Sequence, residues 1–200
     1  MCIHLPFKYR KAVQVLNYFA VKSGGRINEM KALKLVFLSD RFHLRKYGRP
    51  ITNDEYFAMP FGPVASGVKD IAEFSFCLDK SEDDYARQFL ARLNQFTIES
   101  KSNVNQKVFS KSDLEAMEYA WVKFGKLSKY ELSDLTHEYP EWKKHEEFLQ
   151  KFKRVKMSYE DFFEDPPAGV DKCFDLTLEE KTDRLAYLKE NSNIEAAWCH

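Results

Sequence analysis

The stretch from Asn28 to Ile71 constrains the fold of this chain more than any other part of the sequence. Its first half predicts one long helix, because Asn28 is a good N-cap, Gly48 suits a left-handed residue after the last turn, and Pro50 prevents any continuation. Between these signals the apolar residues cover more than one stripe: Met30, Leu33, Leu35, Val36, Phe37, Leu38, Phe42 and Leu44. A helix that is apolar over so much of its circumference is usually central to a packed bundle.

The second half of this stretch predicts a strand and then a rigid turn. The run Glu55–Met59 is short and holds two aromatic residues, and the Pro60–Pro63 segment that follows must form a non-helical turn. Because Pro63 biases Gly62 away from the α region, the next helix can begin only at about residues 64–66. We therefore expect the rest of the chain to pack around this helix, strand and turn.

Composition limits the classes of function that this chain can have. Its 200 residues suit one domain, or one domain with an appendage, and a hydrophobic fraction of 44% supports a real core. Lysine and arginine together number 31, as do aspartate and glutamate, so the formal net charge is zero. A protein whose main task is to grip nucleic acid needs a surplus of basic groups for phosphate contacts. The balance therefore argues against that class, although it allows a local basic patch.

The cysteines and the apolar runs predict a cytoplasmic protein with reduced thiols. The cysteines are scattered through the chain: Cys2, Cys77, Cys173 and Cys199. They form no CxxC pair, which argues against structural zinc and against a disulfide framework. No secretory signal is visible, and apolar runs stay at about four residues, which is too short to span a bilayer. We expect free thiols in the cytoplasm and no membrane association.

Helical periodicity and capping signals predict further helices around the central one. Their expected ranges are Tyr9–Lys22, Val64–Phe74, Ser81–Leu93, Ser112–Phe124, Ser128–His137, Glu141–Phe152 and Thr177–Glu190. Ser112, Ser128 and Thr177 each precede a glutamate by three residues, as in a capping box. The runs Phe96–Glu99 and Lys107–Phe109 flank an Asn-rich connector and predict a small hairpin. The expected fold class is mainly α (α+β): a compact helical domain around one central helix, with a small β-hairpin or short antiparallel sheet.

The composition changes after Glu164. The segment Asp165–Gly169 holds two prolines and a glycine, which is typical of a linker. We therefore expect one domain over residues 1–164 and a Pro-linked C-terminal helical extension over residues 165–200. The extension has few large apolar residues, so we expect it to be dispensable for folding.

The most tempting candidates for chemistry are Asp40, His43 and His137. Asp40 and His43 lie three residues apart on the predicted central helix, so their side chains can project together. If His137 approached them, the three would suit a small metal-dependent hydrolase or nuclease, which stays an alternative. Two histidines without a fixed spacing make a poor metal signature, however, and a histidine at a helix end usually satisfies backbone carbonyls. With no GxSxG, Walker or GxGxxG motif present, we expect no enzyme, no metal and no cofactor.

A basic cluster lies near the end of the central helix and comprises Arg41, Arg45, Lys46 and Arg49. Basic residues there complement the negative end of the helix dipole, and we favour this solvated interpretation over phosphate contact. A DNA-binding regulator stays open as a second alternative. No helix-turn-helix with a basic recognition helix stands out, so nucleic acid is not an expected partner.

Two separated motifs match the pattern of a known family. The first is KALKLVFLSDRFHLRKYGRPI over residues 31–51, followed by FAMPFGPVASGV over residues 57–68. The second is KLSKYELSDLTH over residues 126–137, followed by PEWK from Pro140. Together they resemble the Panacea domain of SocA-like antitoxins and phage-associated proteins. The resemblance covers about Phe7 to Phe163. It departs from the family pattern at Ala32, where a larger polar residue is commoner, and at Glu141, which separates Pro140 from Trp142.

The resemblance implies a non-enzymatic bacterial antitoxin of a type II toxin–antitoxin system, of the kind associated with phage defence. Such a protein neutralises a cognate protein toxin, encoded by an adjacent gene, by binding it directly. Some members of the family are also implied to act as adaptors that deliver the toxin to a protease. The resemblance does not identify the toxin, and the sequence leaves the oligomeric state open.

The expected contact surface lies around the strand, the turn and the second motif. Large aromatic residues near turns often anchor protein interfaces and equally often lie in the core, and preorganised loops lose little entropy on binding. The expected partner-binding residues are Tyr56, Phe61, Gly62, Pro63, His137, Tyr139 and Trp142.

The placement of the central helix gives a first test. Phe37→Asp would bury an unpaired carboxylate, which costs several kcal/mol against a total stability of about 5–15 kcal/mol, so we expect it to prevent folding. Lys46→Ala, at the charged end of the same helix, should be nearly silent. Thermal unfolding of both variants checks this. A soluble Phe37→Asp protein with a normal melting transition would show that Phe37 is not in the core.

Overall fold

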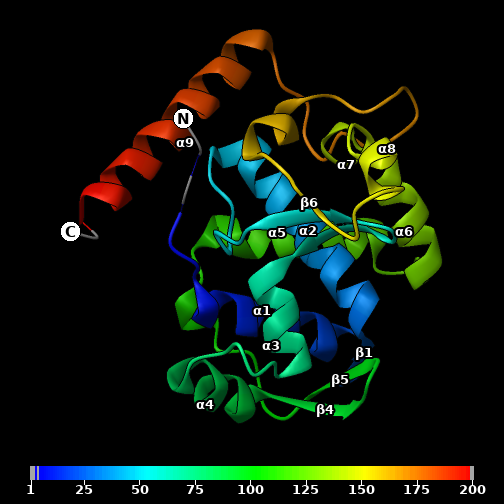
Figure 1. Cartoon of the computed structure of the whole chain (residues 1–200). Coiled ribbons are helices and arrows are strands. Elements are labelled where there is room, and N and C mark those ends of the chain that lie inside the picture. Colours follow the sequence, from blue (N-terminus) through cyan, green and yellow to red (C-terminus); the bar gives the residue numbers. More distant parts are fainter. Residues whose placement is uncertain (1–2, 4, 199–200) are drawn as a thin grey trace.

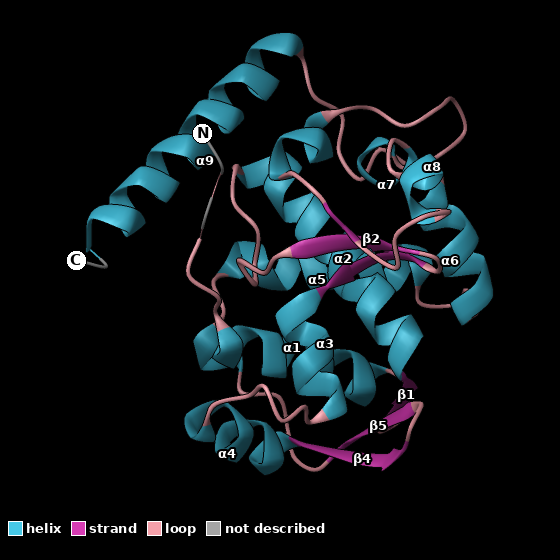
Figure 2. Ribbon diagram, in the orientation of Figure 1, coloured by secondary structure: helices cyan, strands magenta, loops and turns pink. Residues whose placement is uncertain are grey.

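The fold is given by a computed structural model, which describes residue 3 and residues 5–198. These residues are mainly helical and also form two small antiparallel sheets (Figure 2), so the expected fold class is confirmed. Cys77 and Cys173 are unpaired, while Cys2 and Cys199 lie outside the described residues. No helix in the described part of the chain is long and apolar enough to cross a membrane.

Helix α2 (Glu29–Tyr47) runs through the middle of the molecule (Figure 1). Its ends are those that the sequence predicts: the side chain of Asn28 accepts a hydrogen bond from the backbone of Lys31, and Gly48 is left-handed with φ +71°. Every residue from Ala32 to Arg45 is buried, so α2 is the central helix of the fold. The ring of Phe37 contacts three other buried rings at centroid distances of 5.6–5.9 Å, those of Tyr56, Tyr139 and Phe162.

The other helices surround α2 (Figure 1). Their bounds are α1 (Tyr9–Lys22), α3 (Ser66–Glu73), α4 (Lys80–Phe89), α5 (Lys111–Phe124), α6 (Lys129–His137), α7 (Pro140–Lys143), α8 (Glu146–Leu149) and α9 (Leu178–Trp198), with 3-10 turns at Gln106–Val108 and Tyr159–Phe163. Among them α5 packs most extensively on α2, and α1 packs between α2, α3 and α4. The extent of α1 agrees with its predicted range.

Two three-stranded antiparallel sheets lie apart from each other (Figure 2). One has the order β1-β5-β4, with β1 (Arg26–Asn28), β4 (Leu90–Asn94) and β5 (Thr97–Ser100). The other has the order β3-β2-β6, with β2 (Tyr56–Met59), β3 (Gly62–Ala65) and β6 (Val155–Lys156). The N-terminus of α2 follows β1 directly, and the β2–β3 hairpin packs on α2 and α6, so α2 connects the two sheets.

The hairpin lies earlier in the chain than the sequence predicts. The observed hairpin joins β4 to β5 through Gln95 and Phe96, whereas residues 107–109 form a 3-10 turn and its cap. Residues 90–93, expected to continue a helix, are instead extended from Leu90 onward. Leu90, Ile98 and Ile27 are buried together under this sheet, so tertiary burial overrides the local helical pattern.

Two further expectations about helices need correction. The helix expected over residues 141–152 is split into α7 and α8, because buried Glu141 and Trp142 hold α7 against the interior while α8 lies on β2. The capping box of α5 is formed by Ser110 and Asp113, two residues before the predicted one. The capping box of Ser128 on α6 is confirmed.

Arg41 and Arg45 are buried on α2, and they bind the 3-10 turn at Tyr159–Phe163 and the chain that follows it. The guanidinium of Arg41 donates to Glu164 O (2.9 Å) and Lys172 O (2.5 Å). That of Arg45 donates to the backbone carbonyls of Phe162, Glu164 and Phe174 and pairs with Asp165 at 2.5 Å. The interpretation of these two arginines as solvated dipole partners was therefore wrong. Both side chains are fully buried. Their guanidinium donors keep hydrogen-bond acceptors there, because backbone carbonyls more than a hundred residues away in sequence accept from them.

The C-terminal extension packs against the rest of the protein. Cys173 and Leu188 are both buried, the latter on α9. Arg184 of α9 donates to Arg45 O at 2.9 Å, and Tyr187 lies against Gly48 closely enough that a Cβ at Gly48 would approach its ring to 2.9 Å. The domain boundary at residue 164 stays a prediction, but these contacts argue that the extension cannot be removed without a cost in stability.

Truncation after Glu164 tests this cost. It removes Asp165 and the carbonyls of Lys172 and Phe174, leaving buried guanidinium donors without acceptors. We expect the free energy of unfolding to fall by about 3–5 kcal/mol, as when one partner of a buried charge is deleted. Truncation after Asn193 is the matched control, because it keeps every acceptor and Leu188. Chemical denaturation measures both, and equal stabilities of the two truncated proteins would contradict the role of the two arginines.

Candidate functional site

The turn between β2 and β3 is held by side chains from three helices. Each donates a hydrogen bond to a backbone carbonyl of the turn: Trp142 Nε1 of α7 to Met59 O (2.9 Å), Ser133 Oγ of α6 to Phe61 O (3.1 Å), and Lys34 Nζ of α2 to Pro63 O (2.8 Å). Turn carbonyls that find no partner in a strand ladder need such donors once they are buried. The turn is therefore fixed in position by parts of the chain that are distant in sequence.

Gly62 makes this close approach possible. Its φ of +97° is a conformation that side-chain-bearing residues rarely adopt. A Cβ at this position would lie 2.6 Å from both Lys34 Nζ and Thr136 Oγ1, so there is no room for one. The glycine thus serves both the turn conformation and the packing of the turn against α2 and α6.

A groove lies beside this turn, and we refer to it as the hairpin groove. It has a volume of about 490 Å³ and runs between the β2–β3 turn and the β4–β5 turn, over the N-terminal part of α2. It is lined by Asn28, Glu29, Met30, Leu33, Lys34, Met59, Pro60, Phe61, Val64, Lys69, Glu73, Gln95, Phe96, Lys129 and Lys153. The ring of Phe61 is 63% exposed and that of Phe96 is 57% exposed, so each turn presents one large aromatic residue to solvent.

Lys34 is a buried cation in the wall of the groove. Among the described residues its ammonium donates to Pro63 O and forms no ion pair with a carboxylate. Burial therefore lowers the pKa of Lys34 to about 7. Nearby, the ring of His137 stacks on Trp142 with a centroid distance of 3.9 Å, and burial together with the charge of Lys34 lowers its pKa.

The structure brings five of the seven predicted partner-binding residues together around this turn: Phe61, Gly62, Pro63, His137 and Trp142. Only Phe61 is largely exposed. Gly62, Pro63 and Trp142 are buried, and His137 is half-buried. In this conformation the buried members position the turn, and Phe61 is the one that a partner can reach.

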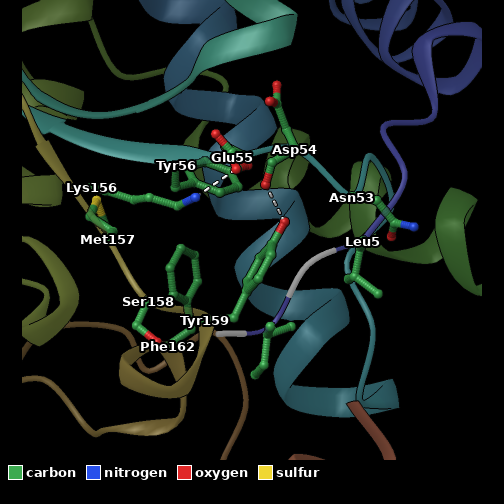
Figure 3. Close-up of a pocket in the computed structure, with 11 residues that line it drawn as sticks. Leu5, Asn53, Asp54, Glu55, Tyr56, Lys156, Met157, Ser158, Tyr159 and Phe162 are labelled. Atoms are coloured by element: carbon green, nitrogen blue, oxygen red, sulfur yellow. Dashed lines mark hydrogen bonds and ion pairs between the residues drawn. The ribbon is translucent and has the colours of Figure 1, made fainter. Parts of the chain in front are cut away.

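The other two predicted residues, Tyr56 and Tyr139, lie in the interior and not on the surface. The hydroxyl of Tyr56 donates to Asp40 at 3.0 Å, and its ring lines a separate cavity of about 260 Å³ (Figure 3). The hydroxyl of Tyr139 donates to Asp171 O at 2.8 Å, and the guanidinium of Arg41 lies 4.3 Å from its ring centroid. Both tyrosines are core residues whose hydroxyls donate to acceptors inside the protein, and their part in partner binding stays a prediction.

The candidate catalytic residues are held in separate networks. Asp40 accepts hydrogen bonds from the backbone of Ile51 and Thr52, and burial raises its pKa to about 6. His43 contacts Arg49 O through Nδ1 (2.6 Å) and Ser112 Oγ through Nε2 (3.0 Å). Burial lowers the pKa of His43 to about 4.

These contacts show no arrangement that unites Asp40 and His43 with His137, which stacks on Trp142. No group of three or more His, Cys, Asp or Glu side chains that could hold a metal ion occurs within the described ranges. The polar atoms of Asp40 and His43 are used to fix the loop that follows α2.

Asp54 is a second buried acid that the sequence gave no reason to single out. Its carboxylate accepts from the backbone of Gly67 (2.8 Å) and Val68 (2.7 Å), so it caps the first turn of α3 from a distance. Its own carbonyl accepts from the hydroxyl of Tyr159, which points toward it in Figure 3. Burial raises the pKa of Asp54 to about 7. These hydrogen bonds tie the loop before β2 to the start of α3 and to Tyr159.

Sequence reasoning missed Lys34, Phe96, Lys129 and Lys153, all of which line the hairpin groove. A usable signal existed only for Lys34, a basic residue on the apolar side of the central helix. Phe96 was assigned to a strand, and its exposure depends on the turn that it forms with Gln95. The two other lysines are ordinary surface residues until the fold brings their elements together.

Comparison with known proteins identifies a family. The family model described as "Antitoxin SocA-like, Panacea domain" matches residues 33–143, which is more than half of the chain. Neither a curated protein nor a solved structure matches the chain. The matched range contains Lys34, the whole β2–β3 hairpin, and both Ser133 and Trp142 that hold it.

The buried amine of Lys34 predicts a pH dependence of stability. Its pKa is about 7 in the folded protein and 10.5 in the unfolded chain, so the unfolded chain binds more protons between these values. The contribution of Lys34 to the free energy of unfolding therefore rises as the pH rises from 7 to 10 and is lost as the pH falls. Lys34→Met removes this dependence. The stability of wild type relative to Lys34→Met should increase over that pH range in thermal unfolding.

Lys126→Met is the matched control for Lys34→Met, because Lys126 is an exposed lysine that does not line the groove. Its stability relative to wild type should not change with pH. A constant difference between wild type and Lys34→Met would contradict the burial of an uncompensated amine.

Proposed function

The chain belongs to the family of SocA-like antitoxins with a Panacea domain, and we propose that it neutralises a cognate protein toxin by binding it directly, without turnover. We further propose that this toxin is encoded by an adjacent gene, as in a type II toxin–antitoxin system, and that the complex forms in the cytoplasm. The family membership supports an antitoxin role. The identity of the partner and the mode of binding are part of the proposal.

The single observation that carries the binding mode is the fixed β2–β3 turn with its exposed Phe61. Three hydrogen bonds from α2, α6 and α7 hold the backbone of this turn, while the ring of Phe61 is 63% exposed. A large aromatic residue on a preorganised turn contributes contact area at little entropic cost. The turn and the residues that hold it all lie within the matched range 33–143.

Binding without turnover is favoured over the two alternatives. The hydrolase alternative needs Asp40, His43 and His137 to act together, and each has its own set of structural contacts. The DNA-binding alternative loses two of its basic residues, because Arg41 and Arg45 are fully buried. No observation in the described residues favours protease delivery over simple inhibition.

Co-expression with the product of the neighbouring gene tests the proposal. We expect growth to be restored and the two proteins to co-purify. Phe61→Glu should weaken the complex by at least about tenfold, or about 1.4 kcal/mol, since a central aromatic anchor is replaced by a charge. The melting temperature of the free variant should be unchanged, because the side chain is mostly in solvent.

Phe76→Glu is the matched control, since Phe76 is 99% exposed in the loop between α3 and α4. It should bind like wild type. Equal binding by both variants would remove the β2–β3 turn from the contact surface. A neighbouring protein that is harmless when expressed alone, or toxic but never retained, would contradict the antitoxin function itself.

A further inference from the structure

The hairpin groove has an apolar floor that can accommodate a large side chain. Met30 and Leu33 of α2 and Met59 of β2 line it together with the two exposed rings, Phe61 and Phe96. The volume of about 490 Å³ falls within the range of about 300–1,000 Å³ that is common for sites that enclose a ligand. An apolar side chain of a partner that enters the groove would remove apolar surface of both proteins from water, which favours binding.

The charges around this floor are unbalanced. The two acids of the groove are already paired: Glu29 with Arg92 at 3.0 Å, and Glu73 with Lys69. Lys129 and Lys153, in contrast, form no ion pair with a carboxylate within the ranges that the structure describes. The rim therefore carries uncompensated positive charge.

Lys129 is positioned beside the groove and does not simply point into solvent. Its Nζ lies 5.9 Å from the ring centroid of Phe96 and 4.9 Å from that of Tyr130. The attraction between the ammonium and the ring faces holds the positive charge of Lys129 next to an apolar surface. The combination of an apolar floor and a cationic rim is complementary to one kind of protein segment.

We infer that the hairpin groove binds a segment of the toxin in which a large apolar side chain is flanked by aspartate or glutamate. The apolar side chain lies on Met30 and Leu33 between the rings of Phe61 and Phe96, and the flanking carboxylates pair with Lys129 and Lys153. This inference rests on the proposed antitoxin function and adds the chemistry of the recognised segment. Nucleic acid fits less well, because the apolar side chains of Met30, Leu33 and Met59 in the floor offer phosphate no hydrogen-bond donor.

The test uses the full-length chain and short overlapping peptides that tile the product of the adjacent gene. The peptides that bind should contain a large apolar residue with acidic neighbours. Lys129→Glu/Lys153→Glu should bind those peptides, and the whole toxin, at least about tenfold more weakly at low salt, since like charges then face each other. The loss should shrink at about 0.5 M salt, where exposed charges are screened. Melting temperatures should match that of wild type.

Lys107→Glu/Lys111→Glu is the charge-matched control, because both lysines are exposed and neither lines the groove. It should bind like wild type. If the toxin is retained equally by both double variants, or if the bound peptides are basic or lack an apolar residue, the groove inference is overturned and the antitoxin function stands. If the toxin is never retained, both fail. If Lys129→Glu/Lys153→Glu only dissociates a wild-type dimer, a second copy of this chain is the occupant, and the inference is again overturned.

Discussion

The ion pair between Arg41 and Glu141, buried at 2.6 Å beneath the C-terminal segment, is the interaction on which much of the architecture depends. Neither charge can be enclosed without the other, because an unpaired buried charge costs several kcal/mol. The remaining donors of Arg41, and all those of Arg45, need further acceptors, which the backbone of residues 162–174 and the carboxylate of Asp165 supply. The two arginines on α2 thus require α7 and the chain after the 3-10 turn Tyr159–Phe163 to meet at the same place.

The same helix uses other buried polar groups in a related way. Asp40 accepts from the backbone at Ile51 and Thr52, and Lys34 donates to Pro63 O. The irregular segments around α2 have backbone groups with no ladder partner, and side chains of α2 provide the partner instead. The helix therefore organises the protein by hydrogen bonding as well as by apolar packing, and this explains why its polar residues are as deeply buried as its leucines.

The sequence allowed the local features to be predicted, and far less of what depends on contacts between distant residues. The limits of α1 and α2, the cap at Asn28, the left-handed Gly48 and the family resemblance all rest on residues close together in the chain. The burial of Arg41 could not be foreseen, because its acceptors lie a hundred residues or more away. The candidate site was predicted in part for the same reason. The turn itself is local, whereas the groove is assembled from elements far apart in sequence.

In the β2–β3 turn, the groups that fix its position differ from the side chain that it exposes to solvent. Its three hydrogen bonds are accepted by backbone carbonyls, and Gly62 has no room for a side chain. The ring of Phe61 is largely exposed and makes none of these three hydrogen bonds. Residue 61 can therefore change its chemical character over the course of evolution while it stays at the same point in space. Such a scaffold can acquire a new binding specificity without first losing its fold.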